Sequence, residues 1–237
     1  MKKRNIWIVP CVFFLVACIL NLSGRLYCEP LAQTVKPSLL PLLAVTTLAY
    51  LISREGVDLR AASLLATAQL FGFAGDTLLI GNGFPMFAGG MAAFLVGHIF
   101  YMYLFGGRSW KGLGPLQWVL SLIVLAAIVA VLVVLIGIKG VMLAPMSIYA
   151  MGLMLLIFTG LCGVVRKEEA LRSDRRTWWI ILLGGLLFTF SDSQIAMDTF
   201  GVLPFEGRGF VIMLTYLAAQ ALLAVGGIRL ALRRQKA

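Results

Sequence analysis

The chain has 237 residues, of which 61% are hydrophobic and only 13% are charged, and its formal net charge is +10. Soluble domains are close to half apolar and a quarter charged, so this composition excludes ordinary cytosolic, disordered and collagen-like proteins and indicates a membrane protein. The positive charge alone would also fit a nucleic-acid partner, a reading that depends on where the basic residues lie.

Apolar runs long enough to cross a bilayer recur along nearly the whole chain. About 20 mostly apolar residues are needed to span about 30 Å of hydrocarbon. We expect an all-α polytopic membrane helix bundle of about eight spans, forming a single integral-membrane domain over residues 1–237. The spans are predicted at residues 5–22, 38–53, 61–81, 88–106, 116–138, 142–164, 178–199 and 209–230.

The first span resembles a processed leader. Residues 2–4 are basic and precede an apolar run, as in a signal peptide, and residues 15–18 (Leu-Val-Ala-Cys) resemble a bacterial lipoprotein cleavage box. The apolar run nevertheless continues beyond Cys18 as far as Leu22. We therefore expect an uncleaved helix.

The basic residues fall mostly on one side of this eight-span model. Sixteen of the twenty lysines and arginines lie on the side of both termini, and the other four are Arg25, Lys36, Lys139 and Arg208. Basic residues accumulate on the cytoplasmic side of membrane proteins. We expect both termini in the cytoplasm, a location in the cell membrane, contacts with membrane lipid and no nucleic-acid partner.

Cysteine and histidine chemistry is limited in this sequence. The four cysteines form no CxxC pair and no metal-binding spacing, and His98 is the single histidine. Sites that need two or three imidazoles are therefore excluded. We expect no disulfide framework and no metal centre.

Two aspartates lie deep in predicted spans. Asp76 is close to the outer end of the third span, and Asp192 lies at a similar depth in the seventh. An ionisable side chain at the bilayer centre costs about 2.5 to 3.5 kcal/mol on insertion scales, which makes both aspartates candidate functional residues. The structural alternative is a hydrogen bond to a neighbouring helix. Asp198 is interpreted as a solvated helix end.

Other polar side chains share this level or lie near it. His98 is near the middle of the fourth span, with Tyr101 one turn further along. Tyr149 lies in the sixth span, and Tyr216 and Gln220 share a face of the last. Each of these residues could equally be a hydrogen-bonded contact between helices. Together they predict a buried pocket that opens toward the outer leaflet.

Lys36 and Pro37 are expected to open the second span from the outer side, since proline suits the first turn of a helix. A lysine at this position either extends to the headgroups or holds a phosphate as a point charge. Both readings stay open.

Two carboxyl groups in a dry pocket favour acid chemistry. Removal from water and a neighbouring like charge both disfavour the ionised form of a carboxyl group. One aspartate could therefore act as a general acid, while the other, held ionised by tyrosine or histidine donors, stabilises a developing cation or positions water.

These positions resemble those of the YhhN-like lysoplasmalogenases, a family of multi-helix membrane proteins. The residues that carry the resemblance are, in chain order, Lys36-Pro37, Gly75-Asp76, Gly97-His98 with Tyr101, Pro145 with Tyr149, Ser191-Asp192, and Tyr216 with Gln220. Each motif alone is weak, and their order over six of the eight spans makes the match specific. The first and fifth spans and the charged run at 166–176 carry no matching motif.

The resemblance implies an enzyme that hydrolyses the vinyl ether bond of a lysoplasmalogen, a lysophospholipid, to a fatty aldehyde and a glycerophospho-alcohol. It implies general acid and base catalysis by Asp76 and Asp192, with no metal or organic cofactor. The substrate-binding residues that it implies are Lys36, His98, Tyr101, Tyr149, Ser191, Tyr216 and Gln220. Lys36 would hold the phosphate at the outer interface.

Two further classes remain open from the sequence. A transporter or proton-coupled carrier also places Asp, His and Tyr at depth, although we see no internal repeat of four plus four helices. A membrane sensor or structural protein is favoured if both carboxylates are fully paired with no cavity between them.

Overall fold

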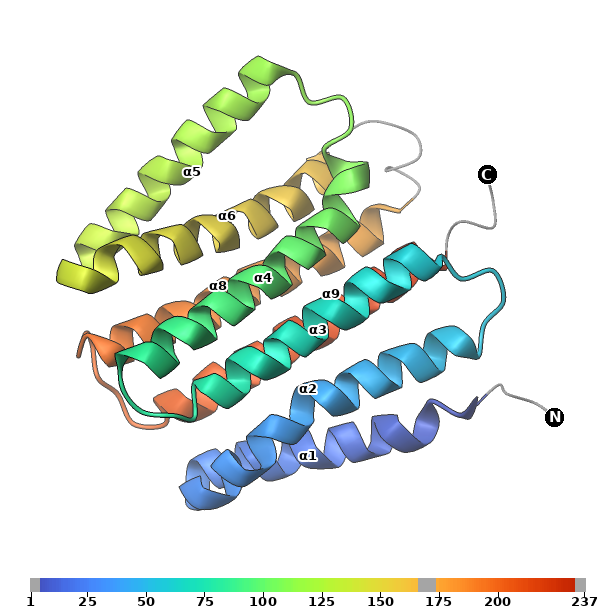
Figure 1. Ribbon diagram of the computed structural model, residues 1–237, viewed down its shortest axis with the longest axis horizontal. Coiled ribbons are helices and arrows are strands. Elements are labelled where there is room, and N and C mark those ends of the chain that lie inside the picture. The colour runs from blue at the N-terminus through green and yellow to red at the C-terminus, as the bar shows by residue number, and fades with distance from the viewer. Residues whose placement is uncertain (1–4, 166–173, 233–237) are drawn as a thin grey trace.

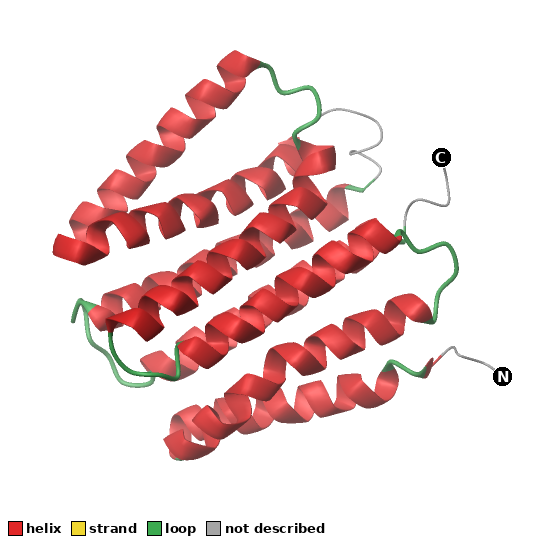
Figure 2. Ribbon diagram, viewed as in Figure 1, coloured by secondary structure: helices red, strands yellow, loops and turns green. Residues whose placement is uncertain are grey.

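The computed structural model describes residues 5–165 and 174–232, and within them the chain is almost entirely helical, with no strand (Figure 2). The expected all-α bundle and its number of long helices are confirmed. In chain order the elements are α1 (Ile8–Tyr27), α2 (Glu29–Ile52), α3 (Leu59–Leu78), α4 (Phe84–Ser109), α5 (Pro115–Ile136), the short 3-10 helix η2 (Gly140–Met142), α6 (Leu143–Val165), α8 (Arg175–Thr199) and α9 (Arg208–Ala231).

Seven of the helices in the described ranges are long and apolar enough to cross a membrane, in agreement with a multi-pass integral membrane protein. The helix outside this set is α3, which carries Arg60 near its start, Gln69 in its middle and Asp76 near its end. It packs beside α2, α4 and α9. Gln69 and Asp76 are buried against these neighbours, whereas Arg60 is exposed.

The helices run up and down in an elongated bundle (Figure 1). Neighbours in sequence pack side by side, as in the pairs α1 with α2, α3 with α4 and α8 with α9. The last helix also contacts α1, α2 and α3, which joins the two halves of the chain. By contrast α5 lies at the periphery, where only Leu125 and Val129 of its residues are buried. This agrees with its sequence, in which Gln117 and Ser121 are the only polar residues besides Trp118.

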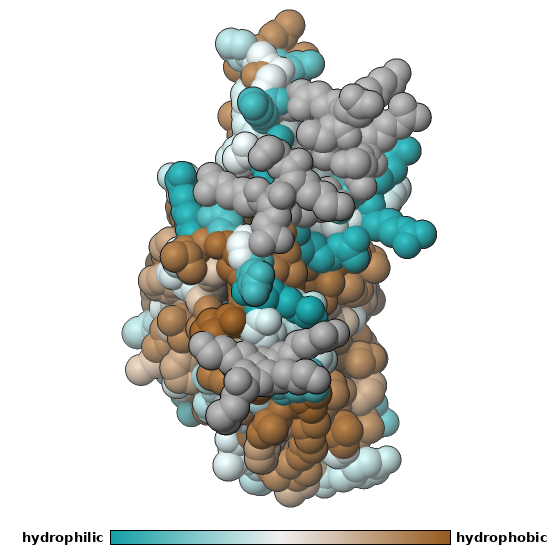
Figure 3. Space-filling model, turned by 90° about the vertical axis from the view of Figure 1, so that its right-hand side faces the viewer, coloured by the Kyte–Doolittle hydropathy of each residue, from teal (hydrophilic) through white to brown (hydrophobic). Residues whose placement is uncertain are grey.

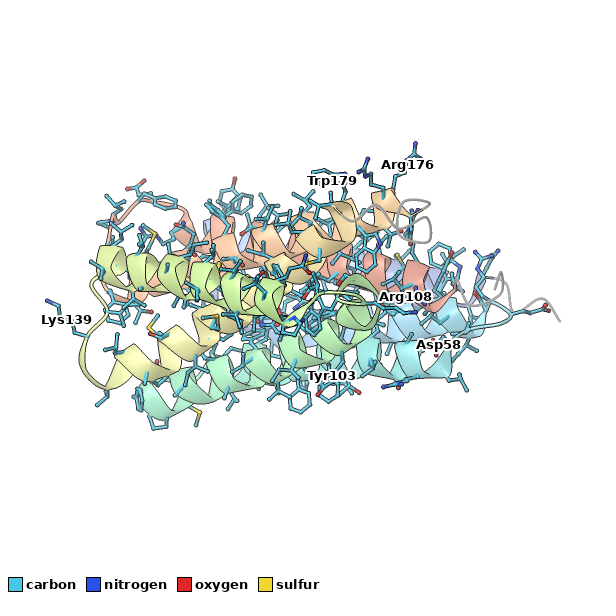
Figure 4. The ribbon with its side chains drawn as sticks, turned by 90° about the horizontal axis from the view of Figure 1, so that it is seen from above. Asp58, Tyr103, Arg108, Lys139, Arg176 and Trp179 are labelled. Atoms are coloured by element: carbon cyan, nitrogen blue, oxygen red, sulfur yellow. The ribbon has the colours of Figure 1, made fainter. Side chains whose placement is uncertain are left out.

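The two ends of the bundle differ in charge. The start of α1 and the end of α9 lie at the same end, where Asp58, Arg108 and Arg176 are found, whereas Lys139 lies at the opposite end (Figures 1 and 4). Hydrophilic side chains gather over the first of these ends (Figure 3). The basic residues at 2–4, 166–172 and 233–236 lie outside the described residues. Assignment of this end to the cytoplasm remains a prediction.

The second helix begins earlier than the hydrophobic pattern predicts. It starts at Glu29, with Pro30 in its first turn, so Pro37 lies inside the helix together with Pro41 and does not open it. An internal proline removes a backbone donor and clashes with the preceding turn. The ribbon of α2 changes direction along its length (Figure 1). Pro37 directly follows Lys36 in this helix.

Candidate active site

Asp76 lies in a buried cluster built from three helices. Its carboxylate on α3 accepts a hydrogen bond of 2.6 Å from the Tyr216 hydroxyl on α9. The Lys36 ammonium group on α2 is 3.5 Å from the other carboxylate oxygen. Asp76 is 2% exposed and Lys36 9%. Such a pair forms only if both charges are desolvated together, so removal of one partner would leave a buried charge unpaired.

Lys36 therefore does not extend to the outer interface, which was one of the two readings of its sequence position. Its helix starts at Glu29, about two turns before Lys36, so the side chain begins well inside the bundle. The ammonium group points at Asp76. Arg25, at the end of α1, also lies within electrostatic range of Asp76. Arg25 is itself paired with Glu29, so Lys36 is the cation that contacts Asp76 directly.

Asp192 lies in a second cluster, between α6 and α8, which a layer of aromatic rings separates from the Asp76 cluster. Its carboxylate on α8 accepts a hydrogen bond from the Tyr149 hydroxyl on α6. The Asp192 side chain is partly buried. Its carboxylate lies within electrostatic range of Asp76 and Lys36, but no lysine or arginine among the described residues forms an ion pair with it. Each aspartate thus has a tyrosine donor, but only Asp76 has a cation.

Aromatic rings fill the space between the two clusters. Phe188 packs edge-on against both Tyr216 and His98, with ring centroids 5.5 and 4.5 Å apart. Phe94 packs against Tyr216 and Phe188 at 6.0 and 5.9 Å. A Cβ atom added to Gly75 would lie 2.7 Å from the Phe94 ring, so the glycine beside Asp76 makes room for that ring.

Sequence reasoning missed these two phenylalanines. Phe94 is four residues before His98, and Phe188 is four residues before Asp192, so each shares a helix face with a candidate residue. That spacing was the available signal. This spacing does not single out the two residues, because phenylalanine is abundant in this sequence and is expected on any membrane-facing surface.

His98, Tyr101 and Gln220 lie next to the Asp76 cluster, on the side nearer to the two chain termini. The Tyr101 hydroxyl donates to Gln220 Oε1 at 3.1 Å, and Gln220 Nε2 donates to the Tyr216 hydroxyl at 3.4 Å. A chain of hydrogen bonds therefore runs from Tyr101 to Asp76. His98 is 1% exposed, and its Nδ1 has no hydrogen-bond partner within the part of the chain that is described. The gap beside it has no room for a water molecule.

Ser191 and Asp198, two further candidates from the sequence, each have a partner that contributes to the packing of the helices. The Ser191 hydroxyl donates to the Ile212 carbonyl oxygen at 3.0 Å, which holds α8 against α9. Asp198 has an exposed side chain and pairs with Arg208 at 3.2 Å. The interpretation of Asp198 as a helix end in solvent is confirmed. The proposed role of Ser191 in substrate binding stays a prediction.

An apolar pocket opens beside the Asp192 cluster, with a cavity volume of about 70 Å³. Its walls come from α4, α5, α6 and α8, and both Asp192 and Tyr149 line it. Phe94 also lines this pocket, whereas Asp76 does not. The Phe94 ring therefore lies between the pocket and the Asp76 cluster.

In the described residues no three His, Cys, Asp or Glu side chains lie close enough together to hold a metal ion. All four cysteines are free thiols, at positions 11, 18, 28 and 162. What the arrangement offers is two carboxylates, two tyrosine hydroxyls, one ammonium group and an apolar cavity. These groups can donate a proton, hold a negative charge and exclude water.

Comparison with known proteins agrees with the resemblance seen in the sequence. The chain is 32% identical to human lysoplasmalogenase TMEM86B over 191 residues, covering 80% of this chain and 73% of the human protein. It is 31% identical to the mouse lysoplasmalogenase TMEM86B, covering 94% of this chain and 87% of the mouse protein. No solved structure matches it. The YhhN family model matches residues 31–227, and the chain belongs to this family.

Proposed function

We propose that this chain is a lysoplasmalogenase-like hydrolase of the cell membrane, which cleaves the vinyl ether bond of a lysoplasmalogen. The products are a fatty aldehyde and a glycerophospho-alcohol. The observation that carries the proposal is the pair of tyrosine-bound carboxylates within the membrane-spanning helices. The names of the human and mouse relatives support the same activity.

The chemistry that such a pair can perform starts with a proton. Transfer of a proton from a carboxylic acid to the β-carbon of the vinyl ether produces an oxocarbenium ion. Water adds to this cation, and the added water returns one proton to the site. The resulting hemiacetal collapses to the aldehyde and the alcohol, so one water is consumed and the acid is regenerated. A positioned acid of this kind contributes about 10²- to 10⁴-fold to the rate.

The surroundings of the two aspartates suggest different parts in this reaction. Asp192 lines the pocket and has no ion-pair partner in the described ranges, so it suits the proton donor. Asp76 is bound to the Lys36 ammonium group, which favours its ionised form. An ionised Asp76 would stabilise the oxocarbenium ion or orient the attacking water, with Tyr216 holding its position.

The remaining candidates support this arrangement at a distance. Tyr149 orients the proposed acid, and Gln220 and Tyr101 hold Tyr216 through the hydrogen-bond chain. His98 packs edge-on against Phe188 between the two clusters and presents an unpartnered nitrogen. His98 is buried and does not line the apolar pocket, so its predicted part in substrate binding would be indirect, through its contact with Phe188.

The test is aldehyde release from a lysoplasmenyl lipid by the purified protein in detergent micelles. We expect activity in the wild type and at least a 100-fold loss in Asp76→Asn and Asp192→Asn, with Asp198→Asn as a matched control on α8. A folded Asp76→Asn or Asp192→Asn protein with the wild-type rate would overturn the mechanism. Vesicle uptake of the lipid without aldehyde release would favour the transporter reading.

A further inference from the structure

The apolar pocket beside Asp192 has a composition that matches one part of a lipid. Of its lining residues only four are polar: Tyr149, Thr189, Asp192 and Ser193. The hydroxyl groups of Thr189 and Ser193 donate to carbonyl oxygens of their own helix, at 2.9 and 2.7 Å. The Asp192 and Tyr149 pair is therefore the polar spot of an otherwise apolar cavity.

The rest of the lining suits a flexible hydrocarbon. Met91, Met146 and Met154 line the cavity, and methionine side chains adapt to irregular apolar shapes. Ala150 and Ala196 leave space where larger side chains would fill it. None of these residues offers a hydrogen bond, so a polar headgroup placed here would lose its hydration without replacement.

The outer wall of the pocket is the least anchored helix of the bundle. Leu132, Val133 and Ile136 of α5 line the cavity, while Val134 and Leu135 on the same turn are 77% and 71% exposed on the surface. One helix thus separates the cavity from the surrounding lipid. Among the described residues only two of α5 are buried, against eleven of α6, the helix that it packs against, so we expect α5 to shift at low cost.

We propose that this pocket receives the hydrocarbon chain of a single-chain lipid, with its first carbons against Asp192 and the rest along α5, and that it sets the chain-length preference. This inference rests on the proposed function and adds to it the position of the chain. The chain would enter from the surrounding bilayer beside α5. Asp192 then lies at the junction between the chain and the headgroup, where a vinyl ether bond is found.

Two adjacent residues of α5 provide a matched test. Val133→Phe places a larger side chain in the cavity, whereas Val134→Phe adds the same group on the lipid-facing surface. We expect Val133→Phe to lower kcat/KM for a long-chain vinyl ether lysolipid by about 10-fold, equivalent to about two buried methylene groups. Its kcat/KM for a short-chain analogue should stay unchanged, and Val134→Phe should change neither.

A binding measurement separates this inference from the proposed function. The probe is an alkyl ether lysolipid, which cannot be cleaved as a vinyl ether, carrying a photoreactive diazirine at the chain end. We expect it to label residues of the pocket, such as Met91 or Met154, in the wild type and in Val134→Phe but not in Val133→Phe. Labelling of this pattern without aldehyde release would reject the proposed function and keep the pocket.

Two outcomes would overturn the pocket assignment. One is equal kcat/KM for the long-chain lysolipid in wild type and in a folded Val133→Phe protein. The other is probe labelling that ignores Val133→Phe while the wild type still cleaves lysoplasmenyl lipid. In that second case the proposed function stands and the chain lies elsewhere.

Discussion

Asp76 and Asp192 are the same residue type, each within hydrogen-bond reach of a tyrosine, but their surroundings differ in two respects. Asp76, between α2, α3 and α9, has a cationic partner and does not line the apolar pocket. Asp192, between α6 and α8, adjoins a cavity and has no cationic partner within the described residues. The two carboxylates therefore differ in their neighbouring cation and in their access to a cavity, and the roles proposed above rest on these two differences.

The largest expected effect concerns stability in the Asp76 cluster. Lys36→Met keeps the length of the side chain and removes its charge, which leaves Asp76 buried beside Tyr216 without a cation. We expect the free energy of unfolding to fall by about 3 kcal/mol. Thermal unfolding of the purified protein in detergent measures the loss.

The double variant Lys36→Met/Asp76→Asn is the control for this change. It removes both charges, so most of the lost stability should return. Asp192→Asn, which has no ion pair to break, should leave stability near the wild-type value. If Lys36→Met unfolds at the wild-type temperature, the ion pair of Lys36 with Asp76 does not distinguish the two clusters.

The next effect compares the two tyrosines in catalysis. Tyr149→Phe removes the hydroxyl that orients Asp192, and leaving a buried hydrogen-bonding group without its partner costs about 1 to 3 kcal/mol. We expect kcat to fall by about 10- to 100-fold. Tyr216→Phe should cost less, because Lys36 still holds Asp76. A larger loss in Tyr216→Phe than in Tyr149→Phe would reverse the assignment of the proton donor.

Phe94 offers a way to disturb the boundary between the clusters. Gly75→Ala would place a methyl group 2.7 Å from the Phe94 ring, so the ring has to move, and overpacking of this kind costs about 1 to 3 kcal/mol. We expect lower stability and about a 10-fold loss of kcat/KM. Gly72→Ala is the control one turn earlier on α3, where the nearest atom would be 3.4 Å away. Equal behaviour of the two variants would show that the Phe94 position is unimportant.

The smallest effect is expected at Tyr101. Its hydroxyl donates to Gln220, and Gln220 is linked to Asp76 through Tyr216 by two further hydrogen bonds. Hydrogen bonds between membrane helices are worth about 0.6 kcal/mol on average. Tyr101→Phe should therefore lower stability slightly and change kcat by less than about threefold. A loss as large as that of Tyr149→Phe would assign Tyr101 a direct part in the reaction.

Much of the bundle follows from the sequence because the bilayer imposes one length on every span. The eight helices and the level of the aspartates could be obtained by counting residues from the helix ends. The start of α2 could not. Glu29, Gln33 and Thr34 are polar and three prolines follow Glu29, which indicates a loop. In the structure the segment is helical, and the Thr34 hydroxyl donates to the Pro30 carbonyl oxygen of the same helix.

The partner of each aspartate was also beyond the sequence. Tyr216 is 140 residues from Asp76, and Tyr149 is 43 residues from Asp192. Which tyrosine meets which carboxylate depends on helix neighbours and on rotation about each helix axis. The depth of a residue in the membrane predicts neither the neighbours of its helix nor the rotation of that helix. The ion pair of Lys36 with Asp76 was missed for a related reason, because Lys36 was placed at the end of a helix that in fact begins two turns earlier.

The weak hydrophobicity of α3 has a consequence for how the protein is made. Insertion machinery releases a segment into the bilayer according to its hydrophobicity, and α3 is the long helix outside the apolar set in the described chain. Only residues 79–83 separate α3 from α4, so the two helices can enter together as a hairpin. We therefore expect Asp76 to enter the membrane interior during biosynthesis together with a neighbouring helix.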